Sequence, residues 1–227
     1  MAATVRLAHR TAGVPDAPPV VLLHGLGDSA ADWDPVLDGL AARWRVFAVD
    51  LRGHGDSDRP GDYSFTLMRD DVLAFLDTAG RDRVALIGHS MGAVVAVLVA
   101  QAAPQRVSRL VLEDATVPRP GDLHRPPLPV PAEPTPYDFA VVNAIRAQLT
   151  DPDPAWWDDT DAVATPTLIV DGAGSDQRQA FLAESAARMP DARVVTIAAG
   201  HHVHRNAPEE FLDAVVRFLP RPGAASL

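Results

Sequence analysis

A chain of 227 residues, of which 47% are hydrophobic, is long enough to bury one well-packed core. Its formal net charge of −10 argues against anionic partners such as nucleic acids and acidic membrane surfaces. The chain has no cysteine, which excludes disulfides and thiolate metal sites.

Apolar runs typical of buried strands alternate with helix-like patterns along the chain. The expected strands are Thr4–Ala8, Val20–His24, Arg45–Asp50, Val84–Ile87, Leu110–Asp114, Thr167–Asp171 and Arg193–Ile197. The expected helices are Asp32–Arg43, Thr66–Thr78, Ser90–Ala102, Tyr137–Leu149, Gln179–Arg188 and Pro208–Phe218. Continuous apolar strands are covered on both faces, and this alternation builds a doubly wound, mostly parallel sheet with right-handed crossovers. We therefore expect an α/β fold with helices on both faces and a site at the carboxyl ends of the strands.

Residues 115–165 interrupt this alternation. Eight prolines fall between Pro118 and Pro136. The segment is too irregular for a simple crossover and too apolar for a disordered linker, so we expect a short cap or lid inserted into a single domain that spans residues 1–227. The alternative is a poorly ordered loop over residues 118–135.

The segment Gly88–Gly92 (Gly-His-Ser-Met-Gly) fits the pattern G-x-S-x-G between an apolar strand and an apolar helix. In this nucleophile elbow the turn is so tight that side chains at the glycine positions would collide. The turn lifts Ser90 out of the sheet at a helix N-terminus, where the helix dipole favours a developing oxyanion. Ser90 is therefore the predicted nucleophile, and it requires a base to activate it.

Four motifs in this order and spacing resemble those of α/β-hydrolase fold enzymes over nearly the full chain. They are His24-Gly25-Leu26-Gly27, Asp50-Leu51-Arg52-Gly53-His54-Gly55-Asp56-Ser57, the elbow around Ser90, and Gly200-His201 followed by Pro208-Glu209-Glu210-Phe211. The resemblance implies an α/β-hydrolase fold with a reduced cap. Within these motifs we expect His24, Arg52 and His54 to be structural.

The resemblance assigns the base to His201, the histidine that directly follows a glycine. Its neighbours His202 and His204 are rivals for this role, and the H-H-x-H cluster also raises the alternative of a metal site. No organised acidic partners lie nearby in the sequence, so we expect no metal and interpret these two neighbours as polar residues at the pocket edge or at a helix start.

Two aspartates compete for the role of triad acid, which holds the imidazole tautomer and stabilises the imidazolium. Most members of the family place the acid after the strand that corresponds to Thr167–Asp171, which favours Asp176, although the loop departs from the common spacing by one residue. A minority place it one strand earlier, which favours Asp114. Asp171 and Glu113 are further alternatives. Each of these residues also has the simpler interpretation of an ordinary carboxylate at a strand end.

The oxyanion hole needs two backbone N–H donors, which we assign to Met91, directly after the nucleophile, and to Leu26. Three aromatic residues, Trp33, Trp156 and Trp157, are candidates for the substrate-binding pocket. The alternative for all three is packing within the core or the lid.

These features predict a serine-dependent hydrolase acting on an ester or related acyl bond of a small to medium substrate. The alternatives are a lyase or cofactor-free enzyme that uses the same triad for proton transfer, and a non-catalytic ligand-binding member of the fold. We expect a small-molecule substrate, no cofactor, no nucleic acid and no membrane partner. The first residues lack the apolar core of a signal peptide and the longest apolar run, Ala93–Ala100, is too short to span a bilayer, so we expect a cytoplasmic protein. The oligomeric state is not defined by the sequence.

Overall fold

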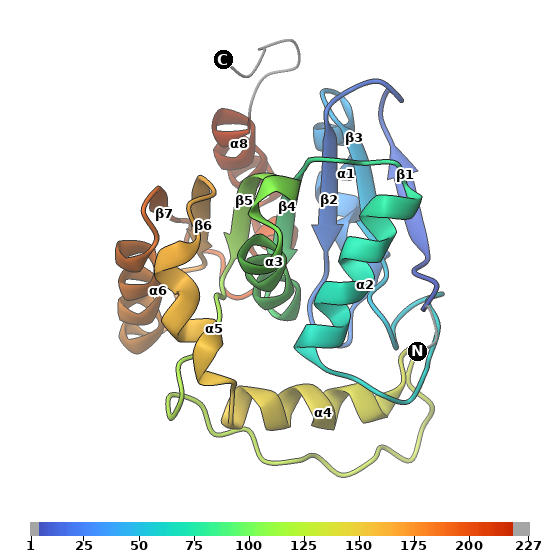
Figure 1. Cartoon of the computed structure of the whole chain (residues 1–227), viewed down its shortest axis with the longest axis vertical. Coiled ribbons are helices and arrows are strands. Elements are labelled where there is room, and N and C mark those ends of the chain that lie inside the picture. The colour runs from blue at the N-terminus through green and yellow to red at the C-terminus, as the bar shows by residue number, and fades with distance from the viewer. Residues whose placement is uncertain (1–4, 220–227) are drawn as a thin grey trace.

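The computed structural model describes residues 5–219, which form a seven-stranded sheet in the order β1-β3-β2-β4-β5-β6-β7. The strands are β1 His9–Ala12, β2 Pro19–Leu23, β3 Arg45–Val49, β4 Val84–His89, β5 Val107–Glu113, β6 Thr167–Asp171 and β7 Ala192–Thr196. Only the edge strand β1 is antiparallel, to β3, and every other pair is parallel. The carboxyl ends of six strands therefore meet at one edge, at the bottom of the sheet in Figure 1.

Helices cover both faces of this sheet (Figure 1). The α-helices are α1 Asp34–Ala41, α2 Phe65–Thr78, α3 Met91–Ala102, α4 Phe139–Thr150, α5 Pro154–Asp158, α6 Asp176–Arg188, α7 Val203–Asn206 and α8 Pro208–Phe218, and the 3-10 turns are η1 Ala30–Trp33, η2 Pro104–Arg106 and η3 Asp159–Ala162. Helices α2, α3 and α6 pack on one face, and α1 and α8 pack on the other. The predicted doubly wound α/β arrangement is confirmed.

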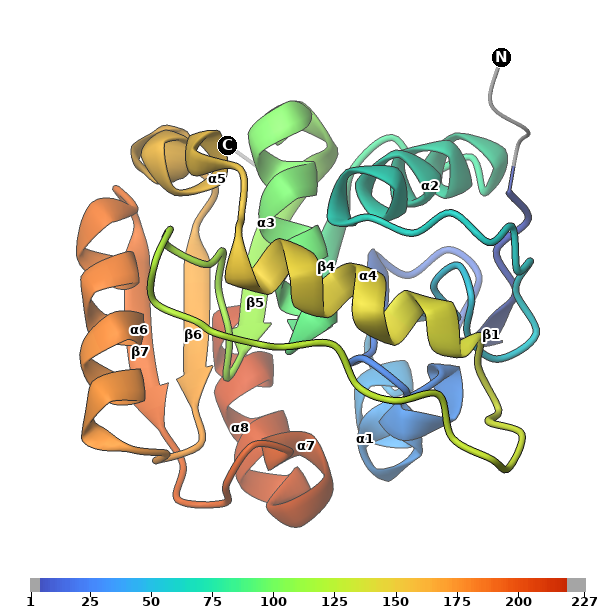
Figure 2. The same cartoon turned by 90° about the horizontal axis from the view of Figure 1, so that it is seen from below.

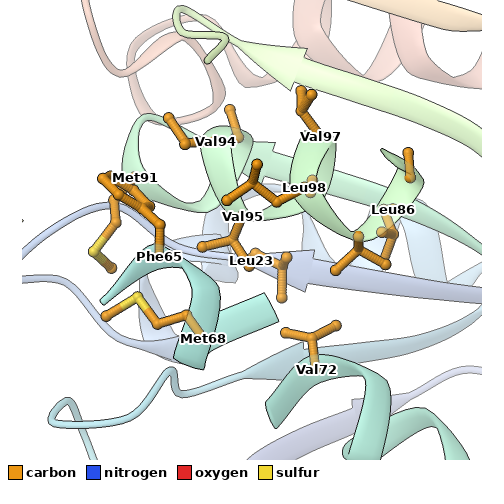
Figure 3. Close-up of a cluster of buried hydrophobic side chains, with 14 of the residues drawn as sticks. Leu23, Phe65, Met68, Val72, Leu86, Met91, Val94, Val95, Val97 and Leu98 are labelled. Atoms are coloured by element: carbon orange, nitrogen blue, oxygen red, sulfur yellow. The ribbon is translucent and has the colours of Figure 1, made fainter. Parts of the chain in front are cut away.

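The larger core lies between the sheet and the helices α2 and α3 (Figure 3). Helix α3 is apolar on all sides and its residues 91–100 are buried, because it sits between the sheet and α2. Met91 and Phe65 belong to this cluster and also border the cavity described below. The core therefore fixes the first turn of α3, and with it the backbone around Ser90.

Six of the seven expected strands agree with the structure to within three residues at either end, and the exception is the first. Thr4 lies outside the described residues, and residues 5–8 form no strand. Their backbone is tied to the loop after β3, where Arg6 N donates to Asp58 Oδ2 (2.8 Å) and Ala8 N donates to Ser57 Oγ (2.8 Å). The strand is instead His9–Ala12, largely exposed at the sheet edge and so without a hydrophobic pattern that could reveal it.

Residues 115–166 leave the sheet at the end of β5 and return at β6. Helix α4 lies across the carboxyl-end edge of the sheet, and the irregular proline-rich segment runs beside it (Figures 1 and 2). This strap, residues 118–136, hydrogen-bonds along α4, where Asn143 exchanges two bonds with the backbone of Leu128. Side chains of the helix thus hold the segment on α4. The short elements α5, η3 and α7 were not among the expected helices.

No helix within residues 5–219 combines the length and the apolar character needed to cross a bilayer.

Candidate active site

Ser90 occupies the turn between β4 and α3 with backbone angles of φ 50° and ψ −112°, a conformation that costs a non-glycine residue energy. Its N–H donates to Glu113 O (3.1 Å), which continues the parallel ladder past the strand end. A Cβ at Gly88 would lie 2.3 Å from Gly92 O, and a Cβ at Gly92 would lie 2.2 Å from Leu23 O. The turn therefore requires glycine at both positions, as the elbow pattern predicted.

A continuous hydrogen-bond chain joins three side chains from three strand ends. Ser90 Oγ lies 3.1 Å from His201 Nε2, and His201 Nδ1 lies 2.6 Å from Asp114 Oδ2. The carboxylate accepts from Nδ1–H, which leaves Nε2 unprotonated and able to accept the serine proton. His201 is partly exposed, with 41% of its side chain accessible, whereas Asp114 is buried.

Asp114 is held in place from several sides at the end of β5, with φ 51°. Its Oδ1 accepts from Gly172 N (3.3 Å), its Oδ2 also accepts from Arg178 Nε (2.9 Å), and its backbone O accepts from Arg178 Nη2 (2.6 Å). Burial alone would raise the pKa of Asp114, but the hydrogen bond from His201 and the charge of Arg178 outweigh it and lower the pKa below its usual value. The carboxylate is therefore ionised at neutral pH.

Asp176, the other sequence candidate, is exposed and is the first residue of α6. Within the described part of the chain no hydrogen bond or ion pair joins its carboxylate to His201, whose Nδ1 is taken by Asp114. Asp171 is buried, and its Oδ1 accepts from Ala173 N of its own loop (2.9 Å) while its Oδ2 accepts from Thr196 Oγ1 of β7 (3.2 Å). The structure thus brings Ser90 and His201 together with Asp114 and leaves Asp176 apart.

Two buried histidines brace the loops that follow β2 and β3. His24 Nδ1–H donates to Gly25 O (2.7 Å) and its Nε2 accepts from Leu51 N (3.0 Å), so this ring links the first loop to the second. His54 makes the reverse link, its Nε2 accepting from Gly27 N (3.1 Å). Burial lowers the pKa of each histidine to about 4, so both rings are neutral and can accept these bonds. The loop that carries Leu26, the sequence candidate for an oxyanion donor, is therefore held from both ends.

A second histidine and carboxylate set lies buried next to the chain of Ser90, His201 and Asp114, and the sequence did not predict it. Glu113 accepts from the ring Nδ1 of His204 (2.7 Å) and from its backbone N (2.9 Å), and His204 Nε2 lies 3.2 Å from Asp32 Oδ2. Burial opposes both charges, yet hydrogen bonds from His204 and His89 lower the pKa of Glu113 to about 2, and the two carboxylates raise the pKa of His204 to about 9. The set is an ion pair that anchors the 201–204 segment to β5. His202, next to it, caps the start of α7, in line with its expected place at a helix start.

Two groups of side chains bring three potential metal-ligating atoms to within 4.8 Å of one another. They are Asp28, His89 and His202, and His89, Glu113 and His204. In the second group the high pKa of His204 means that protons occupy the nitrogens that a metal would need. In the first, Asp28 already pairs with Arg205 through Oδ1 (2.6 Å).

A cavity of about 580 Å³ opens above Ser90 and His201, and Leu26 and Met91 also border it. None of the three tryptophan candidates is among the residues that line this cavity. Trp33 is buried on the opposite face of the sheet among the residues of α1 and α8. Trp156 packs edge-on against Phe65 (5.6 Å between ring centres) and Trp157 stacks on Phe181 (5.7 Å). Phe65 and Phe181 line the cavity, so Trp156 and Trp157 pack against residues of its wall.

The chain is similar to known proteins in both sequence and structure. The model of the alpha/beta hydrolase fold family matches residues 18–144. An uncharacterized protein of Mycobacterium tuberculosis is 41% identical over 48% of this chain, which spans 32% of that relative's length. An sn-1-specific diacylglycerol lipase of Mus musculus is 28% identical over a match that covers 89% of this chain and 81% of the lipase. A crystal structure of a hydrolase from Pseudomonas aeruginosa superposes with a TM-score of 0.78 at 28% identity, covering 93% of both chains.

With more than half of its length matched by the family model, the chain belongs to the α/β-hydrolase fold family. The parallel sheet, the elbow at the end of β4 and the crossover helices agree with that assignment. The predicted family and fold class are thereby confirmed, and the names of the lipase and the P. aeruginosa protein agree with the predicted enzyme class.

Proposed function

We propose that the chain is a serine-dependent hydrolase that cleaves an ester or related acyl bond of a small to medium substrate. The observation that carries the proposal is the hydrogen-bond chain from Ser90 through His201 to Asp114 beside a cavity. A serine hydroxyl is a weak nucleophile, and an imidazole in hydrogen-bond reach, oriented by a carboxylate, is the arrangement that activates it. The mouse relative's name, a lipase, supports an ester as the bond cleaved.

In the acylation half of the reaction, Ser90 Oγ attacks the carbonyl carbon while its proton passes to His201 Nε2. The tetrahedral intermediate collapses as the bond to the leaving oxygen breaks, and His201 gives the proton to that oxygen. Asp114, ionised and bonded to Nδ1–H, stabilises the transient imidazolium. The products of this half are a free alcohol and an acyl ester on Ser90.

In the deacylation half, water loses a proton to His201 Nε2 and its oxygen attacks the acyl carbon. The bond to Ser90 Oγ breaks, the proton returns to the serine, and the acid is released. The negative oxygen in both halves is assigned to the backbone N–H groups of Met91 and Leu26. Met91 begins α3, so its N–H is among the first four of the helix, which have no partner inside it.

The inserted segment 115–165 acts in this proposal as the cap of the cavity within a single domain. Helix α4 and the strap supply Arg146 and Arg125 to the lining, and the body of the domain supplies Ser90 and His201. Asp138, at the start of α4, accepts from Tyr63 Oη (2.5 Å), which ties the cap to the loop before α2. The cap thus borders the substrate and helps to shield the reaction from water.

Intact-mass spectrometry after treatment with a fluorophosphonate probe tests this function. The wild type is expected to gain one probe per chain, and Ser90→Ala and His201→Ala to gain none. Ser108→Ala is the matched control, because Ser108 lies near the start of β5 and is not among the residues that line the cavity, and it is expected to label like the wild type. Labelling of Ser90→Ala at the wild-type rate, or no labelling of the wild type, would overturn the proposal.

A further inference from the structure

The cavity beside Ser90 is rich in arginine, although the whole chain carries a net charge of −10. Four arginines line it, against two carboxylates. The lining arginines are Arg119, Arg125, Arg146 and Arg178, and the acids are Asp122 and Glu184. The charge of this wall is therefore opposite in sign to that of the molecule.

On the α6 side of the cavity the arginines are used within the protein. Arg119 Nη1 lies 2.9 Å from both carboxylate oxygens of Glu184, and its Nε donates to Asp122 (3.1 Å). Arg178 is bonded to Asp114. These two charges are matched by neighbouring carboxylates, so this side offers no free cation to a ligand.

On the α4 side the arginines have no acidic partner anywhere in residues 5–219. Arg146 is half-buried on α4, and its Nε donates to the backbone O of Pro126 (2.8 Å), which leaves both Nη groups without a protein acceptor in that range. Arg125 precedes Pro126 in the strap, and its backbone N donates to Thr150 Oγ1 (2.8 Å). The bonds at Arg125 and Pro126 hold this part of the strap on α4, and both arginines are among the residues that line the cavity.

Much of the remaining lining is apolar. The larger apolar side chains that line the cavity are Leu26, Phe65, Met91, Val94, Leu149 and Phe181. A cavity lined by a nucleophile, by apolar side chains and by two arginines without an acidic partner in residues 5–219 suits a molecule that has an acyl bond, a short apolar chain and an anion.

Building on the proposed function, we propose that the substrate is an ester that also carries a carboxylate, bound by Arg146 and Arg125 of the cap. A guanidinium group presents paired N–H donors in the geometry of a carboxylate, and such charge-assisted pairs are stronger than neutral ones. The bond from Arg146 Nε to Pro126 O holds the side chain before substrate arrives, so little side-chain freedom is lost on binding.

Two pairs of activated esters test this inference. The first pair places the charge on the acyl side, comparing mono-4-nitrophenyl adipate with 4-nitrophenyl hexanoate. The second places it on the leaving group, comparing 4-carboxyphenyl acetate with its methyl ester. In at least one pair the acid is expected to have a kcat/KM at least about 10-fold higher, because a hydrogen bond to a charged group contributes about that factor or more.

Arg146→Gln and Arg125→Gln are expected to reduce kcat/KM for the preferred acid by roughly 10-fold each while leaving its neutral partner nearly unchanged. Arg217→Gln is the matched control, because it removes the same charge from the exposed side of α8 and is expected to have no effect. Raising the ionic strength from about 0.01 M to 1 M is expected to weaken the preference, since salt screens the attraction.

The inference is overturned if the neutral ester is preferred in both pairs, or if the preference survives in the Arg125→Gln, Arg146→Gln double variant. Either result, obtained with Ser90 still labelled by the fluorophosphonate, leaves the proposed function intact. If no ester is cleaved and Ser90 is not labelled, the proposed function and this inference both fail.

Discussion

The ends of β5 and β6 are neighbours in the sheet and both carry acidic residues, but they are used in different ways. At the end of β5, Glu113 and Asp114 each reach a histidine of the 201–204 segment, one buried and one beside Ser90. At the end of β6, Asp171 accepts from Ala173 N of its own loop and from Thr196 Oγ1 of β7, and Asp176 lies exposed at the start of α6. The carboxylates of β5 therefore bond to the 201–204 segment, while the carboxylate of β6 holds a turn and the adjacent strand.

The segment after β6 contributes to the site through Arg178. It lies two residues after Asp176 on α6 and extends to the carboxylate and the backbone oxygen of Asp114. The loop after β6 therefore supplies a cation that holds the acid of β5. The position of the acid in the chain therefore matters less than which carboxylate is held against the imidazole.

The largest expected effect comes from removing the acid at β5. Asp114→Asn should reduce kcat for an activated ester by three to four orders of magnitude, because an amide favours the wrong imidazole tautomer and cannot stabilise the imidazolium. Steady-state kinetics with 4-nitrophenyl esters measure this loss, and circular dichroism checks that the variant is folded. A loss of less than about 10-fold would contradict the role of Asp114 as the acid that acts on His201.

Removing the cation that holds this acid should have an intermediate effect. Arg178→Gln is expected to lower kcat by roughly 10- to 100-fold. This range is typical when a residue that hydrogen-bonds to a site residue and orients it is removed. Because Arg178 lowers the pKa of Asp114, the acidic limb of the pH profile of kcat should move to higher pH. Arg178→Lys should restore part of the rate, and an unchanged pH profile in Arg178→Gln would limit its role to packing.

The buried pair at β5 should govern stability and its pH dependence. Folding raises the pKa of His204 from 6.5 to about 9, so its contribution is complete below pH 6.5 and is lost as the pH rises through 9. Folding lowers the pKa of Glu113 from 4.5 to about 2, so its contribution is present above pH 4.5 and is lost as the pH falls through 2. The neutral His24 and His54, with pKa values of about 4, lose their contribution as the pH falls from 6.5 toward 4.

These directions predict a maximum of Tm near pH 6 to 7. Glu113→Gln should lower Tm at that pH by roughly 10 °C, because the buried charge of His204 then loses one of its two carboxylate partners. It should also flatten the decline of Tm between pH 7 and 9, since Glu113 is one of the two carboxylates that raise the pKa of His204. Differential scanning fluorimetry across pH 4 to 10 measures both effects, and an equally steep alkaline decline in the variant would contradict them.

The smallest effect is expected at the end of β6. Asp176→Asn removes an exposed carboxylate without a contact to His201, and surface changes of this kind typically alter stability by less than about 0.5 kcal/mol. Its kcat should stay within about twofold of the wild type. A loss comparable to that of Asp114→Asn would transfer the role of acid to β6.

Much of the fold and part of the site could be predicted because their signals are local. Apolar runs revealed six strands, and the elbow around Ser90 combines a strand, two sterically required glycines and a helix within a few residues. The choice between Asp114 and Asp176 could not be made, because it depends on which strand end faces His201, which lies more than twenty residues away from either. The edge strand β1 has no apolar pattern, and the sequence therefore placed it too early.

Other features depend on contacts that no local pattern reveals. Arg178 meets Asp114 across 64 positions of the chain, and Glu113 meets His204 across 91. A tryptophan looks the same in the sequence whether it lines a pocket or packs behind its wall. The sequence alone therefore could not say which of these positions Trp33, Trp156 and Trp157 occupy. A cytoplasmic location and the lack of nucleic-acid and membrane partners stay predictions.

The central claim is that Ser90 is activated through His201 by the acid at the end of β5. Its most direct test needs no knowledge of the substrate: the rate constant of fluorophosphonate labelling, measured by intact mass for the wild type, Asp114→Asn and Asp176→Asn. The predicted result is slowing by about three orders of magnitude in Asp114→Asn and none in Asp176→Asn. Unchanged labelling of Asp114→Asn, or equal slowing of both variants, would contradict the claim.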